Sequence, residues 1–142
     1  MDRDKQEYLF AKYPLLYRGK SKPMTRSLMC FGISCGNGWF QIIDDLSAKL
    51  EGLIRRYQYQ VPARWLPEAM QVKEKFAGLR FYMDGKETRE IRAAIREAEA
   101  RADVTCETCG AGNAKSVQLH GGMGWWFKMC KNCHKNKRKP TG

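Results

Sequence analysis

The stretch QVKEKFAGLRFYM, residues 71–83, decides the fold, because it predicts two strands joined by a tight turn. Its second half is rich in aromatic residues, and Gly78 lies where a turn is needed. If Ala77 and Gly78 form the connection, the facing pairs are Phe76 with Leu79, Glu74 with Phe81 and Val72 with Met83. One face of the hairpin is then apolar except for Glu74. Alanine disfavours positive φ, so a longer loop with a shifted register stays open, as does a helix over VKEKF.

The opposite face of the predicted hairpin carries Lys73, Lys75, Arg80 and Tyr82. Side chains alternate between the two faces of a strand, so these four point away from the core. We expect them to contact nucleic acid or a protein partner. A solvated strand without a partner is the alternative.

Three further segments are predicted to be helical. The first is a short helix closed by the apolar cluster of Tyr8, Leu9 and Phe10, and it ends near Tyr13 because the residue before Pro14 is pushed out of the α region. The second covers residues 39–58, where apolar residues recur at helical spacing after a turn at 36–38. The third covers about 87–102 and has a narrow apolar face of small residues. That face consists of Ile91, Ala94, Ile95, Ala98 and Ala102.

Four cysteines, in CETCG at residues 106–110 and CKNC at 130–133, form the most informative motif. Two C-x-x-C pairs at this separation are typical of a zinc ribbon, with strands at 117–120 and 125–129 between them. Two disulfides or reduced core cysteines are the alternative. Four protein ligands leave no open position on the metal, so the Zn²⁺ is expected to be structural. The predicted ligands are Cys106, Cys109, Cys130 and Cys133.

The predicted fold class is therefore α+β, a small helix and hairpin domain followed by a zinc-ribbon-like module. The body covers residues 1–103, the module 104–134 and a basic tail 135–142. Composition favours a cytoplasmic protein, since no apolar stretch approaches the roughly 20 residues of a membrane span and no secretory signal opens the chain. The cytoplasm keeps thiols reduced, which favours metal binding over disulfides.

Charge favours association with nucleic acid. The net charge is +11, from 26 Lys and Arg against 15 Asp and Glu, and such an excess concentrates phosphate near the surface. The last fifteen residues hold six cations and no acid. These cations are Lys128, Lys131, Lys135, Lys137, Arg138 and Lys139.

Two adjacent tryptophans precede this basic segment. Neighbouring residues of a strand face opposite ways, so we expect at least one of Trp125 and Trp126 to be partly exposed. An exposed Trp125 would stack on a base or anchor a protein partner. The alternative is that both tryptophans complete the small core of the module.

Other chemically active residues give weaker signals. Cys30 and Cys35 are interpreted as buried thiols, because two further ligands for a second metal are not found nearby. His134 follows Cys133 directly and could replace it as a ligand, but we expect it to lie beside the metal ligands or in solvent.

Adjacent carboxylates do not form a catalytic site here. Asp44 and Asp45 diverge by about 100° on a helix, so they are expected to be surface charges, with Asp45 pairing with Lys49. The sequence contains no recognisable nucleophile–base set, phosphate-binding loop or metalloprotease motif, and we predict no catalytic residue.

Several stretches together resemble a family of small phage and prophage proteins. They are KYPLLYR, FGISCGNGWFQIIDDLSAKL, QVKEKFAGLRFY and EARADVTCETCG, followed by a late C-x-x-C, and they cover nearly the whole chain. Members of that family usually have sequences similar to CGDGW and VKEKFGGLRFY at these places, so Asn37 and Ala77 depart from the family's motifs. The resemblance implies a phage setting, a mixed α/β body and a zinc module, and it implies no substrate.

Three classes of function follow. The favoured class is a zinc-containing accessory protein that binds nucleic acid, weakly and without sequence preference, or a nucleic-acid-associated complex. The alternative is a phage-encoded inhibitor or modulator of a host protein, in a defence system or the transcription machinery. A nuclease ranks last, because no converging acidic cluster is present.

Overall fold

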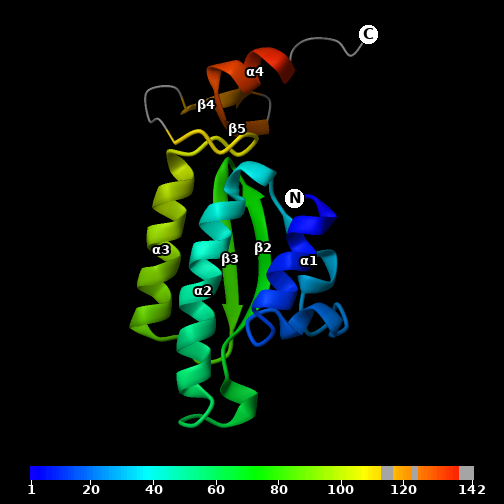
Figure 1. Cartoon of the computed structure of the whole chain (residues 1–142), viewed down its shortest axis with the longest axis vertical. Helices are drawn as coiled ribbons and strands as arrows, with labels where there is room; N and C mark the ends of the chain where they lie inside the picture. Colours follow the sequence, from blue (N-terminus) through cyan, green and yellow to red (C-terminus); the bar gives the residue numbers. More distant parts are fainter. Residues whose placement is uncertain (113–116, 123–124, 138–142) are drawn as a thin grey trace.

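The computed structural model describes residues 1–112, 117–122 and 125–137, and it confirms the α+β fold class. The main sheet has three strands. Figure 1 shows helices packed beside this sheet, with a small hairpin and helix beyond one end of it. The helices are α1 (Arg3–Lys12), α2 (Phe40–Tyr57), α3 (Arg89–Asp103) and α4 (Lys131–Lys137). The strands are β1 (Ile33–Ser34), β2 (Glu68–Lys75), β3 (Gly78–Asp84), β4 (Val117–Gly122) and β5 (Trp125–Cys130). Single 3₁₀ turns lie at Arg18–Ser21, Met29–Phe31, Asn37–Trp39 and Ala63–Trp65.

The main sheet has the strand order β1-β2-β3. β2 and β3 form the antiparallel hairpin, while β1 is parallel to β2, with Ile33 opposite Val72. The sequence did not predict β1, because two residues are too few to show a strand period. Val72, Leu79 and Phe81 are buried, so the apolar face of the hairpin lies against the core as predicted.

The turn of the hairpin differs from the predicted one. Phe76 and Ala77 are its central residues, with φ of 52° and 65°, so Gly78 belongs to β3 and pairs with Lys75. Positive φ at both central residues is what a type I′ turn requires. The Glu74 carboxylate also accepts a hydrogen bond of 2.7 Å from the Ala77 N–H within this turn. The shift places Val72 opposite Phe81. The prediction that Phe76 covers the core is therefore wrong, and its side chain is 69% exposed.

In Figure 1, the two long helices lie side by side, with α2 next to β3 and α3 to the left of α2. α2 buries one face. α3 is capped by Thr88, whose hydroxyl oxygen accepts a hydrogen bond of 3.3 Å from the Ile91 N–H. Asp45 pairs with Arg101 at 2.6 Å, and not with Lys49 as predicted, because α3 packs against α2 and brings Arg101 closer. The guanidinium of Arg101 lowers the pKa of Asp45. The residues of α2 that form the buried face include Ile42, Ile43, Leu46, Leu50 and Ile54.

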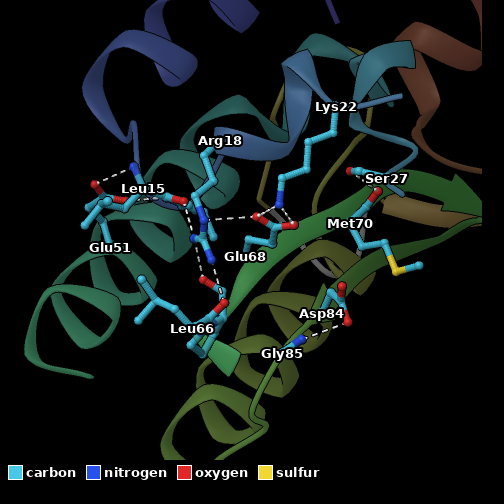
Figure 2. A network of polar contacts seen from close by, with 12 residues as sticks. Leu15, Arg18, Lys22, Ser27, Glu51, Leu66, Glu68, Met70, Asp84 and Gly85 are labelled. Carbon is cyan, nitrogen blue, oxygen red and sulfur yellow. Dashed lines mark hydrogen bonds and ion pairs between the residues drawn. The ribbon is translucent and has the colours of Figure 1, made fainter. Parts of the chain in front are cut away.

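Two buried carboxylates fix the segment between α1 and β1 to the body. Glu51 accepts a hydrogen bond of 3.1 Å from the backbone N–H of Leu15. Glu68 forms ion pairs with Arg18 and Lys22, at 3.0 and 2.7 Å (Figure 2). Burying a carboxylate is costly unless hydrogen bonds or opposite charges surround it, so each of these contacts compensates that cost. A segment without regular helical or strand spacing thereby becomes part of the core.

Hydrophobic side chains gather in two separate clusters. The larger one fills the body between the helices and the sheet. The smaller one lies in the C-terminal module and consists of Cys106, Val117, Met129 and Cys130. Because two of its four members are cysteines, the module depends on the chemistry of its sulfur atoms.

Candidate metal centre and basic sheet face

The first cysteine pair is a tight knuckle directly after α3. Gly110 donates its N–H to the carbonyl oxygen of Cys106 at 2.9 Å, and its φ of 82° is a conformation that favours glycine. The N–H of Cys106 donates in turn to the carbonyl oxygen of Ala111 at 2.9 Å. These bonds turn the chain so that Cys106 and Cys109 face the same side.

The second cysteine pair lies where β5 meets α4. Cys130 is the last residue of β5, and Cys133 lies in the first turn of α4. β5 is held against the knuckle by the N–H of Glu107, which donates to the carbonyl oxygen of Lys128 at 2.9 Å. The β4–β5 hairpin thus places the second cysteine pair next to the first.

The four predicted ligands come together. Their sulfur atoms all lie within 4.8 Å of one another, and Sγ of Cys109 is 3.7 Å from Sγ of Cys130. All four thiols are free, so none of them forms a disulfide. A cluster of this composition and spacing could hold a metal ion.

The environment of the cluster favours one thiolate and resists further ones. Burial alone would raise the pKa of Cys106, but backbone hydrogen bonds from Cys130, Cys109 and Thr108 outweigh it and lower the pKa to about 7. Burial and the three neighbouring thiols raise the pKa of Cys133. Four thiolates at this separation repel one another unless a cation lies between them. The donor set therefore fits a divalent metal.

The knuckle is docked on the turn that precedes α2. Gly38 donates its N–H to the carbonyl oxygen of Glu107 at 2.7 Å, and Gly36 donates to the Glu107 carboxylate at 2.9 Å. A β-carbon on Gly38 would lie 2.1 Å from the carbonyl oxygen of Cys106, and one on Gly36 would lie 2.3 Å from that of Glu107. No side chain fits at either position. The sequence identified this stretch as a turn but gave no sign that it contacts the cysteines.

The predicted basic face lies on the side of the sheet opposite to the buried Val72 and Phe81. Lys73 and Arg80 are directly opposite each other across β2 and β3. Both are partly exposed, and no carboxylate in the described part of the chain forms an ion pair with either. Lys75 is exposed, with Nζ 5.6 Å from the centre of the Phe76 ring, and Tyr82 is 41% exposed. The four side chains form what we call the basic sheet face.

The predicted cations of the module are only partly described. Lys128 is half-buried on β5, and Lys131 and Lys135 are exposed on α4. The side chains of Trp125 and Lys137, and the whole of Arg138 and Lys139, lie outside the described residues. Trp126 is 40% exposed, as expected for at least one of the two tryptophans.

Three further residues are placed by the structure. His134 stacks on His120, with ring centres 3.8 Å apart, and all four cysteines of the cluster remain available as ligands beside it. Cys35 is buried, as predicted. Cys30 is exposed, so that part of the prediction is wrong: Cys30 lies in a single 3₁₀ turn in which Met29 takes the buried position.

Comparison of the chain with models of known families, with curated proteins and with solved structures finds no match. Among the described residues, no helix combines the length and the apolar character needed to cross a membrane. Fold and site together define an α+β protein with a four-cysteine cluster that could bind a metal ion.

Proposed function

We propose that the chain is a zinc-containing protein that binds nucleic acid, or a complex that contains nucleic acid, through the basic sheet face and the cations of the C-terminal module. Tetrahedral zinc with Zn–S bonds of about 2.3 Å places its sulfur ligands about 3.8 Å apart. The separation of 3.7 Å between Cys109 and Cys130 agrees with this geometry. Four cysteines complete the coordination shell, so the zinc has a structural role.

The observation that carries the nucleic-acid proposal is the pairing of Lys73 with Arg80. Like charges directly opposite on neighbouring strands destabilise a sheet, and no carboxylate among the described residues compensates this pair. A bound phosphate would supply the missing negative charge. Tyr82 lies on the same face, next but one to Arg80, and offers a ring on which a base can stack.

The biological setting we propose is that of a phage accessory protein. The support for this is the resemblance of the CGNGW and VKEKFAGLRFY stretches to small phage and prophage proteins. In that setting the nucleic acid would be bound weakly and with little sequence preference, because phosphate contacts carry no sequence information.

Fluorescence anisotropy of labelled single-stranded and duplex oligonucleotides tests the proposal. Affinity should fall steeply with salt, with a log–log slope of roughly −3 to −5 for duplex DNA. Changing Lys73, Lys75 and Arg80 together to Gln should weaken binding and reduce the slope by about 2 to 3. Removal of residues 135–142 should also reduce the slope.

A matched control distinguishes the effect of the basic sheet face from the effect of net charge. Lys20, Arg64 and Arg89 are exposed cations on other elements, and changing them to Gln lowers the net charge of +11 by the same three units. We expect this control to bind nearly as well as the unchanged protein. Equal loss in both triple variants, or binding that ignores salt, would contradict a role for the basic sheet face.

A second candidate function is modulation of a host protein. It is favoured by an apolar patch on the outside of the module, where Leu119 is 51% exposed and Trp126 is 40% exposed. Exposed aromatic residues are frequent anchors of protein interfaces. Capture of host proteins from lysate with and without nuclease treatment distinguishes the two functions, because only partners bound through nucleic acid are lost on digestion.

A further inference from the structure

The two edges of the main sheet differ in how they are protected. On the β1 side, the side-chain oxygen of Gln6 accepts a hydrogen bond of 2.8 Å from the Ile33 N–H. Further along that side, the backbone of β2 is bonded to two loop residues: Ala69 donates to Leu16 and Met70 accepts from Leu28, at 2.8 and 2.9 Å. Three backbone groups on this side of the sheet are therefore bonded to the loop and to α1.

The β3 side is open. β3 is seven residues long and pairs only with β2 in the described part of the chain. The outward N–H and C=O groups of an unpaired edge are a template for another strand, and proteins usually cover or shorten such an edge. Among the described residues, β3 is not short and no other strand pairs with its outer edge.

A groove of about 400 Å³ lies along this open edge, between β3 and α3. In Figure 1, α3 lies on the side of β3 away from β2, with α2 drawn between them, and α3 contacts β3. The groove is lined by the continuous run of residues 80–87 and by one side of α3. Its floor is apolar, from Met83, Ile91 and Ile95, and its rim carries Arg80, Lys86 and Arg96. A strand added to the outer edge of β3 would lie along this groove.

The charges of the groove favour an acidic occupant. Arg80, Lys86 and Arg96 have no ion pair in the described structure. Of the three carboxylates that line the groove, Glu87 is paired with Arg92 at 3.1 Å, which leaves Asp84 and Glu99 to oppose three cations and gives the groove a net charge of +1.

We propose that this groove binds an extended acidic segment of a partner protein, which adds to β3 as a fourth strand. Backbone hydrogen bonds to β3 would supply affinity, alternate apolar residues would cover the floor, and acidic residues would meet the rim. A second copy of the chain fits poorly, because two β3 strands would bring their arginines together in a protein of net charge +11. Nucleic acid gains nothing from an aliphatic floor or an open strand edge. This interaction goes beyond the proposed nucleic-acid binding.

The probe is a fluorescent eight-residue peptide of alternating valine and glutamate, with anisotropy as the readout and the full chain as the binder. Two further versions are N-methylated, one at every valine and the other at every glutamate. Residues along a strand direct their N–H groups alternately to its two edges, so only one version loses the edge that pairs with β3. We expect that version to bind at least about tenfold more weakly. Equal binding by all three peptides, or equal loss in both methylated versions, would overturn strand addition.

Variants locate the site. Arg96→Glu should weaken binding of the unmodified peptide about fivefold or more, whereas Arg89→Glu, an exposed position on α3 outside the groove, should not. Lys73→Gln should leave peptide binding unchanged and weaken oligonucleotide binding, so failure of either proposal is seen separately. If Arg96→Glu abolished oligonucleotide binding and spared the peptide, the groove would be a nucleic-acid site and the peptide proposal would be wrong.

Discussion

The indole Nε1 of Trp39 donates a hydrogen bond of 3.0 Å to the carbonyl oxygen of Thr105, one residue before the first cysteine of the cluster. Trp39 is fully buried at the start of α2, so this bond joins the core of the body to the first knuckle of the module. Together with the hydrogen bonds from Gly36 and Gly38 to Glu107, it fixes the direction of the knuckle. The cysteine cluster is therefore positioned partly by residues that precede it by about seventy positions.

Gly38→Ala should break this junction. The added carbon would lie 2.1 Å from the carbonyl oxygen of Cys106 and 2.5 Å from that of Glu107, and backbone atoms on both sides cannot move aside independently. We expect a loss of about 3 kcal/mol in the free energy of unfolding, the upper part of the range for overpacking. Chemical denaturation followed by circular dichroism measures it.

Gly52→Ala is the matched control for that change. Gly52 is exposed on α2, and an added carbon would meet nothing within 4 Å. Alanine is a better helix former than glycine, so the control should gain about 0.5–1 kcal/mol. A Gly38→Ala protein as stable as this control would show that the knuckle is not docked on the turn.

Cys109→Ser should remove the metal. Protein purified without added zinc should contain about one equivalent of zinc per chain by atomic emission, and the variant should contain little, because serine is a poor ligand in a site built for thiolates. The β4–β5 hairpin should lose its order while the body stays folded, since the body has its own hydrophobic cluster. Retention of the metal by the variant would rule out the four-cysteine assignment.

Several parts of this arrangement can be predicted from the sequence because they follow repeating local patterns. The helical spacing of apolar residues predicts a helix over 39–58, and α2 spans Phe40–Tyr57. The paired C-x-x-C motifs predict which four side chains gather, because each motif sets its own geometry. Alternation along residues 71–83 predicts the buried face of the hairpin except at its turn.

The remaining features depend on tertiary contacts that no local pattern encodes. Gly36 and Gly38 are glycines because the backbone of Cys106 and Glu107 lies against them, and a turn motif alone does not say what lies opposite. The turn at Phe76 and Ala77 contradicts the preference of both residues for negative φ, because the register that pairs Val72 with Phe81 outweighs it.

The two cysteines outside the cluster should react differently with iodoacetamide. Alkylation requires the thiolate. Burial, followed by the nearby charge of Glu107, raises the pKa of Cys35 to about 12, so its thiolate fraction near pH 8 is very small and reagent cannot reach it. Cys30 is exposed. Peptide mass spectrometry of the native, metal-loaded protein should find modification at Cys30 and almost none at Cys35. Comparable labelling of both residues would show that Cys35 is not held in the core.

The two faces of the β2–β3 hairpin should respond differently to substitution. Phe81 is 4% exposed, so Phe81→Ala should cost about 3–5 kcal/mol in the free energy of unfolding, the usual range for truncating a buried aromatic side chain. Phe76 is its matched control on the same hairpin: at 69% exposed in the turn, Phe76→Ala should change stability by no more than about 0.5 kcal/mol. The triple change of Lys73, Lys75 and Arg80 to Gln should be neutral or slightly stabilising, because it removes the repulsion between Lys73 and Arg80 across the strands. Urea denaturation of the four proteins measures these differences. A triple variant as unstable as Phe81→Ala would mean that these cations support the fold, and the basic sheet face could no longer be assigned to binding.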